Sequence, residues 1–240
     1  MKRLILIRHG QSIWNAENKF TGWVDSPLSE QGIREAKKAG DLIKQLNVNV
    51  DMAFTSYLSR AISTLNILME KIKDNNFKVY KSWYLNERHY GVLTGLNKTE
   101  TKKKIGDSLF LQYRRSWNIS PPPIINKKNN KISYGHLNES ISSDKIPKTE
   151  SLKDTYERVI KYYSTTIIDY LADDKTIIIA AHGNSLRALC KYLFEISNES
   201  ISDLEIPTGN PMIINLLSDF SIDNAFYLDE SRAKPLINAN

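Results

Sequence analysis

The sequence has little of what would cross-link a small domain or carry it through a membrane. Its 240 residues include a single cysteine, Cys190, so no intrachain disulfide can form. No apolar run approaches the roughly 18 residues that a bilayer-spanning helix needs, and the N-terminus lacks the basic start, long apolar centre and cleavage site of a signal peptide. We therefore expect a soluble, cytoplasmic protein with no membrane partner.

Metal-ligand patterns are also missing. The four histidines, His9, His89, His136 and His182, include no pair at i, i+4 spacing, and no Cys/His cluster has the spacing of a zinc site. Asp and Glu residues do not pair at ligand spacing either. The sequence therefore predicts a protein without a metal cofactor.

Acidic residues are scarce in the first half of the chain. Residues 1–120 carry 20 Lys and Arg against 11 Asp and Glu, a net charge of +9, while residues 121–240 carry 13 against 16, a net charge of −3. No helix-turn-helix, RNP or zinc-finger pattern accompanies the basic residues, which disfavours nucleic acid as a partner. A small phosphorylated molecule is the better expectation.

What is present is an alternation of strand and helix patterns. Short apolar runs predict strands, and apolar positions three or four residues apart predict helices. The predicted strands are 2–7, 50–55, 78–81, 176–181, 212–217 and 225–228. The predicted helices are 30–46, 58–72, 98–105, 108–117, 152–171 and 186–194. This order predicts an α/β fold: a three-layer sandwich with a mostly parallel central sheet flanked by helices.

A segment of different character interrupts this alternation at about residues 83–150. It holds two of the short predicted helices, then Pro121–Pro123 and an Asn-, Lys- and Ser-rich stretch that reaches Lys148 without periodicity. We expect a single domain over residues 1–240, in which this helical and looped insertion lies over the active site as a substrate-binding lid.

Two apolar strands end in the same way. One runs into RHGQSIWN at residues 8–15, and the other runs into HGNS at residues 182–185. Either histidine alone is more often a residue with a purely structural hydrogen bond. In a parallel sheet, however, ligands bind beyond the carboxyl ends of the strands. Two adjacent strands would therefore bring His9 and His182 together in one crevice.

The residues beside these histidines suit a phosphate. Gly10 and Gly183 let the backbone turn and approach a bound group closely. Arg8 offers a forked cation, and Asn15 and Asn184 offer neutral donors.

Other charged residues stand between the predicted elements: Arg60 at a helix start, NERHYG at residues 86–91, Lys98 near a helix start, and the pair Arg114 and Arg115. Each alone is most simply a solvated charge, but together they favour an anion site.

Taken together, these segments resemble the cofactor-dependent phosphoglycerate mutases of the histidine phosphatase superfamily, over almost the whole chain. The matching motifs, in the family's order and spacing, are 8–15, 20–23, 27–29, 86–91, 95–98, 114–115, 180–187 and 206–209. The sequence departs from the family at Thr94, where Gln is usual, at Asn210, where an aliphatic residue is usual, and in the divergent stretch 124–148.

The resemblance implies catalytic roles. His9 would be the nucleophile that becomes phosphohistidine, and Glu87 would be the acid and base for the substrate hydroxyl. Arg8, Arg60 and His182 would stabilise the transferred phosphoryl group, and His182 would do so best as a cation.

The resemblance also implies a substrate site. Its residues would be Arg8, His9, Gly10, Gln11, Ser12, Asn15, Thr21, Gly22, Arg60, Glu87, Arg88, His89, Tyr90, Lys98, Arg114, Arg115, Gly183 and Asn184. Within this set, Arg88, Tyr90, Lys98, Arg114 and Arg115 would hold the substrate's carboxylate and its second phosphate.

The implied reaction is the interconversion of 3-phosphoglycerate and 2-phosphoglycerate in glycolysis and gluconeogenesis, primed by 2,3-bisphosphoglycerate and independent of metal. Two alternatives stay open: a bisphosphoglycerate synthase or phosphatase, and a non-catalytic phospho-ligand-binding protein. Loss of His9, Glu87 or His182 would indicate the non-catalytic binding protein, and all three residues are present. Because family members are usually dimers or tetramers, we expect a homodimer, with a tetramer as the alternative.

Overall fold

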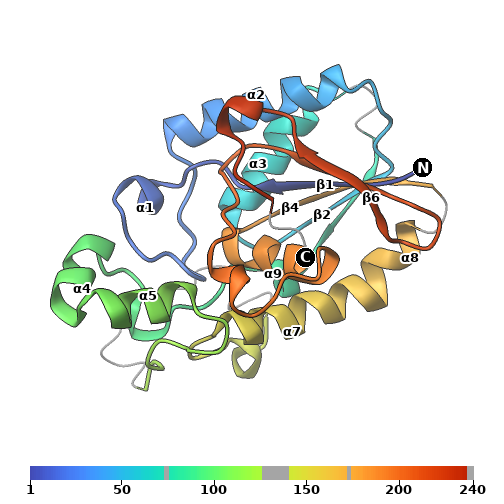
Figure 1. Ribbon diagram of the computed structural model, residues 1–240. Helices are drawn as coiled ribbons and strands as arrows, with labels where there is room; N and C mark the ends of the chain where they lie inside the picture. The colour runs from blue at the N-terminus through green and yellow to red at the C-terminus, as the bar shows by residue number, and fades with distance from the viewer. Residues whose placement is uncertain (73–75, 126–140, 172–173, 237–240) are drawn as a thin grey trace.

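The centre of the molecule is a six-stranded sheet (Figure 1). The computed structural model describes residues 1–72, 76–125, 141–171 and 174–236. The strands are β1 (Lys2–Arg8), β2 (Met52–Thr55), β3 (Lys78–Lys81), β4 (Thr176–Ala181), β5 (Met212–Leu216) and β6 (Ile222–Tyr227). They lie in the order β3-β2-β4-β1-β5-β6. The first four in this order are mutually parallel, while β5 and β6 are antiparallel to their neighbours. The predicted α/β class and mostly parallel sheet are confirmed.

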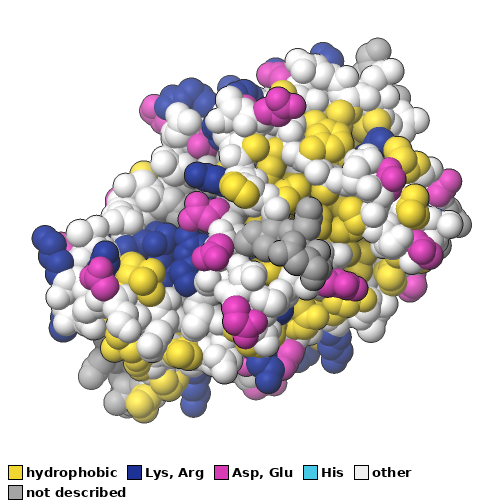
Figure 2. Space-filling view, viewed as in Figure 1, with side chains coloured by type: hydrophobic (Ala, Val, Ile, Leu, Met, Phe, Trp, Pro, Cys, Tyr) yellow, Lys and Arg dark blue, Asp and Glu magenta, His cyan; other side chains and the backbone are white. Residues whose placement is uncertain are grey.

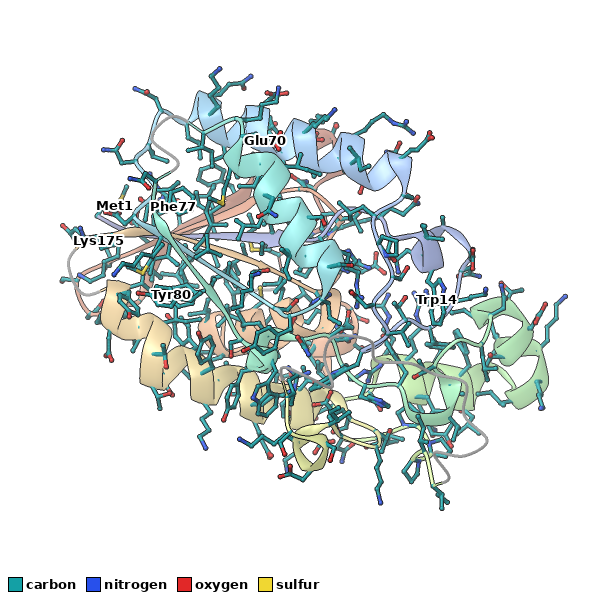
Figure 3. The ribbon with its side chains drawn as sticks, turned by 180° about the vertical axis from the view of Figure 1, so that it is seen from behind. Met1, Trp14, Glu70, Phe77, Tyr80 and Lys175 are labelled. Atoms are coloured by element: carbon teal, nitrogen blue, oxygen red, sulfur yellow. The ribbon has the colours of Figure 1, made fainter. Side chains whose placement is uncertain are left out.

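Helices cover both faces of this sheet. The helices are α1 (Ile13–Ala16), α2 (Glu30–Gln45), α3 (Ser59–Met69), α4 (Lys98–Ile105), α5 (Asp107–Arg115), α7 (Leu152–Tyr162), α8 (Ile168–Leu171) and α9 (Gly183–Leu193). Helices α2 and α3 lie on one face, and α7, α8 and α9 lie on the other (Figures 1 and 3). The three layers of the predicted sandwich are therefore present.

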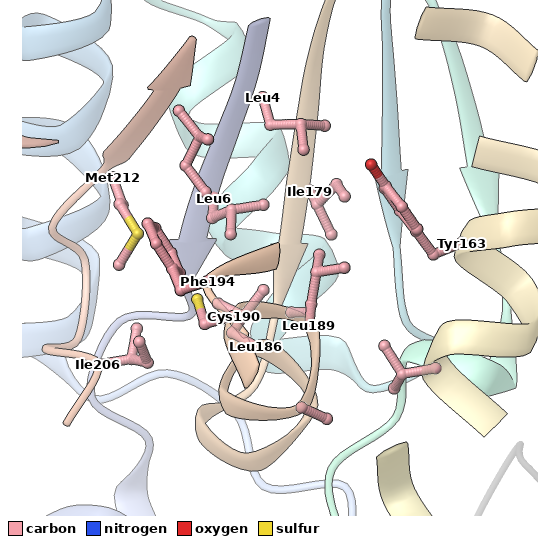
Figure 4. Close-up of a cluster of buried hydrophobic side chains, with 14 of the residues drawn as sticks. Leu4, Leu6, Tyr163, Ile179, Leu186, Leu189, Cys190, Phe194, Ile206 and Met212 are labelled. Carbon is pink, nitrogen blue, oxygen red and sulfur yellow. The ribbon is translucent and has the colours of Figure 1, made fainter. Parts of the chain in front are cut away.

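Two separate hydrophobic clusters form because side chains alternate along a strand. On β1, Ile5 and Ile7 pack with residues of α2 and α3. Leu4 and Leu6 point the other way and pack with α7 and α9 (Figure 4). All four side chains are buried, and full burial of such a side chain contributes about 1.5–3 kcal/mol. A strand buried on both faces is continuously apolar, which is why β1 lacks the alternation of a surface strand.

The predicted helix 152–171 is interrupted. A π-helical turn, Tyr163–Ile167, separates α7 from α8. The hydroxyl of Thr165 donates to the carbonyl of Lys161 at 2.7 Å and so competes for a backbone acceptor of the helix. The wider turn places both Tyr163 and Ile167 in the core.

The helical segment α4–α5 lies at one end of the sheet, beside α1 (Figure 1). The amide of Phe20 donates to the carbonyl of Leu96, and Trp14 lies at the same junction (Figure 3). Of the predicted insertion 83–150, residues 126–140 lie outside the described residues, so the predicted loop is described only in part. Within the described ranges, no helix is long and apolar enough to cross a bilayer.

Candidate active site

The site is built where β1 and β4 end. These parallel strands pair with Arg8 opposite Ala181, so the next residues, His9 and His182, lie side by side. The amide of His9 donates to the carbonyl of Ala181 at 2.9 Å, and the two imidazole centroids are 4.9 Å apart at an interplanar angle of 61°. Both side chains are buried.

Two contacts of His9 define its tautomer. Nδ1 lies 2.7 Å from the carbonyl oxygen of Gly10, which can only accept, and Nε2 accepts from Arg60 Nε at 3.2 Å. The proton therefore resides on Nδ1. Burial, together with the charges of Arg60 and Arg8, holds the pKa of His9 well below its ordinary value. The imidazole is thus neutral, with the Nε2 lone pair directed toward Arg60.

Arg60, in the first turn of α3, is held by main-chain acceptors. Its guanidinium donates to the carbonyls of Gly22 at 2.8 Å and Val24 at 2.9 Å. Gly22 has a φ of +55°, the left-handed region that favours glycine. Burial lowers the pKa of Arg60 to about 10, so the group is still a cation at neutral pH.

His182 has a different partner. Its Nε2 lies 2.8 Å from the hydroxyl of Ser56, and its Nδ1 is buried without a hydrogen-bond partner among the described residues. Burial, then Arg60 and His9, hold the pKa of His182 well below its ordinary value. His182 is therefore neutral in the ligand-free protein, because burial and the charge of Arg60 oppose a second positive charge there; that it acts best as a cation beside a bound phosphoryl group stays a prediction.

Glu87 connects two parts of the site. Its Oε1 accepts from the amide of Arg88 at 2.8 Å, from the amide of Asn184 at 3.1 Å and from Asn184 Nδ2 at 2.9 Å. These bonds join the segment 86–90 to the N-terminus of α9. That helix begins at Gly183 rather than at the predicted residue 186, which is why the amide of Asn184 is free to donate.

Tyr90 is held beside this group. Its hydroxyl lies 3.0 Å from Asn184 Nδ2, and the Arg88 guanidinium lies 4.7 Å from its ring centroid. Burial opposes ionisation of Tyr90, but Arg88 and Lys98 outweigh it and lower the pKa of the phenol.

A buried ion pair supports the Glu87 segment from behind. Arg158 Nε lies 2.7 Å from Glu150 Oε1, and Arg158 Nη2 donates to the carbonyl of Glu87 at 3.0 Å. The other oxygen of Glu150 accepts from the amide of His89 at 2.8 Å. One carboxylate and one guanidinium thereby fix the backbone on both sides of residue 88.

The cleft in front of His9 has a volume of about 200 Å³. It is lined by Arg8, His9, Asn15, Lys19, Phe20, Thr21, Gly22, Arg60, Glu87, Tyr90, Lys98, Arg114, Arg115, Gly183, Asn184, Arg187, Glu205, Ile206, Pro207 and Lys234. Figure 2 shows a hollow beside α4 and α5 where Lys and Arg side chains gather. Two guanidinium nitrogens at this cleft, Nε of Arg8 and Nε of Arg187, are buried and have no partner among the described residues. This surface fits a ligand with several negative charges.

The structure does not place every predicted residue on the wall of the cleft. Gly10, Gln11, Ser12, Arg88, His89 and His182 are not among the residues that line it. Ser12 caps α1, and the amide of Gln11 donates to Glu35. Arg88 donates to the carbonyls of Tyr113 and Arg114, at 3.0 and 2.9 Å, and so supports the end of α5. His89 Nδ1 accepts from the amide of Gly91.

Several residues of the cleft were not predicted: Lys19, Phe20, Arg187, Glu205, Ile206, Pro207 and Lys234. A signal existed for Arg187, because it lies one helical turn after Gly183 in α9 and so on the same side of the helix. Nothing in the sequence pointed to Glu205 or Lys234, which reach the cleft only through the path of the chain after α9. Within the described residues, no three His, Cys, Asp or Glu side chains group as a metal site would.

Comparisons with solved structures agree with this fold. A mycobacterial glucosyl-3-phosphoglycerate phosphatase superposes with a TM-score of 0.72 at 21% identity, covering 95% of this chain and 97% of that one. Bacillus stearothermophilus YhfR superposes with a TM-score of 0.68 at 22% identity, covering 92% and 94%. At this level of identity the similarity concerns the fold.

Sequence comparisons are closer. The model of the histidine phosphatase superfamily, branch 1, matches residues 4–129 and 126–219. The chain is 52% identical to the 2,3-bisphosphoglycerate-dependent phosphoglycerate mutase of Pelagibacter ubique over 241 aligned residues, which cover 99% of each chain. It is 45% identical to the enzyme of that name from Staphylococcus aureus, covering 95% of this chain and 100% of that one. The chain therefore belongs to the histidine phosphatase superfamily and, within it, to the 2,3-bisphosphoglycerate-dependent phosphoglycerate mutases.

Proposed function

We propose that this protein interconverts 3-phosphoglycerate and 2-phosphoglycerate through a phosphohistidine at His9, primed by 2,3-bisphosphoglycerate. The observation that carries this proposal is the neutral imidazole of His9, whose Nε2 accepts from Arg60 at the inner end of a cationic cleft. The names of the closely similar mutases support the substrate and the primer.

The chemical step follows from the tautomer. Nε2 of His9 gives up its hydrogen bond from Arg60 and attacks phosphorus; a nitrogen–phosphorus bond forms, and the phosphorus–oxygen bond of the donor breaks. The positive charge that develops on the ring is stabilised by the bond from Nδ1–H to the carbonyl of Gly10. In the reverse direction a substrate hydroxyl attacks the phosphohistidine and restores His9.

Glu87 moves the proton in this scheme. It protonates the leaving oxygen when His9 is phosphorylated and takes the proton of the attacking hydroxyl when His9 gives up the phosphoryl group. Its hydrogen bonds to described residues all fall on Oε1. Oε2 is thus the oxygen left to exchange the proton.

The transferred phosphoryl group needs positive charge and donors around its oxygens. Arg8 and Arg60 provide cations at neutral pH, and Asn15 provides an amide at the cleft. His182, which contacts His9, would gain a proton more readily beside the bound anion than in the free protein, because the anion offsets the charge of Arg60.

The outer part of the cleft would hold the rest of the substrate. Lys98, Arg114 and Arg115 line it, and in this scheme they would bind the carboxylate and the second phosphate. Arg88 contributes by fixing the end of α5, since it donates to two carbonyls there. Thr21 and Gly22 complete the wall.

Three broader parts of the proposal concern the molecule as a whole. We propose that the segment 83–150 is a substrate-binding lid within a single domain, since α4 and α5 carry three of the outer cations. We also propose a cytoplasmic homodimer, the arrangement that the family resemblance favours. Sedimentation equilibrium of the purified chain tests the dimer.

One assay tests the reaction itself. Formation of 2-phosphoglycerate from 3-phosphoglycerate is followed directly by phosphorus NMR, which needs no metal-dependent coupling enzyme, with and without 2,3-bisphosphoglycerate. Turnover should require the primer, persist in excess EDTA and fall in micromolar vanadate, which mimics the in-line transition state. Loss of activity in EDTA with recovery in manganese, and no response to primer or vanadate, would overturn the mechanism. Phosphate release without mutase turnover would indicate a phosphatase instead.

A further inference from the structure

Glu205 is a second carboxylate at the cleft, and the catalytic scheme does not use it. It lies between the short helix Ser200–Ser202 and β5. Its Oε1 lies 2.5 Å from Arg115 Nη2, and its Oε2 lies 4.0 Å from Lys234 Nζ. Both cations line the cleft. Figure 2 likewise shows acidic side chains at the border of the basic patch. An acid therefore occupies part of a surface that suits anions.

Main-chain hydrogen bonds fix the backbone that carries this carboxylate. The next residue, Ile206, accepts from Arg8 Nη1 at 2.9 Å, and the hydroxyl of Tyr227 lies 3.5 Å from the carbonyl oxygen of Glu205. Burial alone would raise the pKa of Glu205, but the bond to Arg115 and the charge of Lys234 lower it. Glu205 is thus an anion at neutral pH.

The ion pair can nevertheless open to a ligand. The side chain of Glu205 is 48% exposed and that of Arg115 is 22% exposed. An exposed pair of this kind contributes little net stability, because water and salt screen it. An anionic group that approaches Arg115 must share the guanidinium with Glu205 or displace the carboxylate, and it is repelled by the carboxylate in both cases.

We propose that Glu205 is a specificity-determining residue, which competes with the outer anionic group of the ligand for Arg115. The repulsion grows with the charge of the ligand, so Glu205 weakens binding of a doubly phosphorylated ligand more than that of a singly phosphorylated one. The identity of these ligands rests on the proposed function; the competition for Arg115 rests on the geometry. Because of this competition, the doubly phosphorylated ligand can dissociate from the cleft although the cleft is rich in cations.

The test compares Glu205→Gln with a matched control, Asp203→Asn. Asp203 lies two residues away and is exposed, and its carboxylate accepts from the hydroxyl of Ser202 at 3.1 Å. Both substitutions remove one negative charge, but only the first removes it from the cleft. Both are made in a His9→Ala background, which prevents turnover, and binding of 2,3-bisphosphoglycerate and 3-phosphoglycerate is measured by calorimetry.

Glu205→Gln should tighten binding of 2,3-bisphosphoglycerate by roughly 5- to 10-fold and binding of 3-phosphoglycerate by less than about 3-fold, and both gains should shrink in 0.5 M KCl. Asp203→Asn should change neither by more than about 2-fold. Equal effects of the two substitutions, or weaker bisphosphate binding in Glu205→Gln, would overturn the inference. Absence of mutase turnover in the unmodified chain would overturn the proposed reaction and leave this binding comparison valid.

Discussion

The inner end of the cleft and its outer wall are built differently. At the inner end, the rings of His9 and His182 and the guanidinium of Arg60 are buried and held by bonds to main-chain carbonyls or a buried hydroxyl. At the outer wall, Arg115 and Lys234 are partly exposed and share one carboxylate. The inner groups cannot reorient without breaking the packing around the strand ends, whereas the outer groups can.

This difference separates two tasks. Groups fixed in place before the ligand arrives can stabilise a transition state without reorganising, so the inner end should govern turnover. Partly exposed cations attract and retain a charged ligand, and salt screens them, so the outer wall should govern binding. Four experiments test this division, from the largest expected effect to the smallest.

Replacing His9 by Ala should lower turnover by roughly 10⁴-fold or more, because the nucleophile is lost and no described neighbour replaces it. Incubation with labelled 2,3-bisphosphoglycerate should leave acid-labile, base-stable phosphate on the unmodified chain and none on the variant. Label that survives acid, or that persists in the variant, would contradict the role of His9.

Replacing Glu87 by Gln keeps the shape of the side chain but removes the group that exchanges a proton. Turnover should fall by roughly 10²-fold or more while binding of 3-phosphoglycerate changes little. Steady-state kinetics and calorimetry measure the two quantities separately. An unchanged turnover number would mean that another residue is the acid and base. A loss of binding affinity without a loss of turnover would mean that Glu87 serves to bind the substrate, as the outer residues do.

Stability should depend on pH through the buried histidines. Burial and Arg158 lower the pKa of His89 to about 4, and the pKa values of His9 and His182 are also lowered. Between the unfolded value of about 6.5 and these folded values, the unfolded chain binds more protons, so the free energy of unfolding falls as pH falls. His89 alone should contribute a loss of about 3 kcal/mol by pH 4.

Urea unfolding between pH 7.5 and pH 5 measures this slope, with His89→Gln as the comparison. In the variant, the free energy of unfolding should change less steeply with pH. The difference corresponds to up to one proton fewer taken up on unfolding, even if the variant is less stable at pH 7.5. Identical slopes would mean that His89 titrates normally in the folded protein.

Replacing Arg115 by Met removes an outer cation while keeping a long side chain. KM for 3-phosphoglycerate should rise by about 10-fold with kcat nearly unchanged, and the difference should shrink in high salt. Lys19→Met is a suitable control, because Lys19 also lines the cleft but is not among the residues proposed to hold the substrate, and its ammonium lies 2.6 Å from Glu17. A fall in kcat as large as the rise in KM would show that Arg115 contributes to turnover as well as to binding, and would contradict the proposed division between the inner end and the outer wall.

The sequence alone determined the strands and the nature of the site. The apolar runs before His9 and His182 predict buried strands, since only a strand covered on both faces buries consecutive apolar side chains. The motifs around Glu87, Arg114 and Arg115 identified the family, because each is a local run of residues with characteristic spacing. These features depend on residues that are close together in the sequence, so they can be predicted from local sequence patterns.

The tertiary structure alone decided how those residues are held and charged. Glu150 and Arg158 fix the segment of Glu87 from more than 60 positions further along the chain, and no local pattern encodes that contact. The neutral state of His182 in the ligand-free protein follows from burial beside Arg60, which lies more than 100 positions earlier in the chain. Glu205 enters the cleft only because the chain after α9 returns past Arg115. Burial and electrostatic interaction depend on distances in space, and these exist only once the strands have paired.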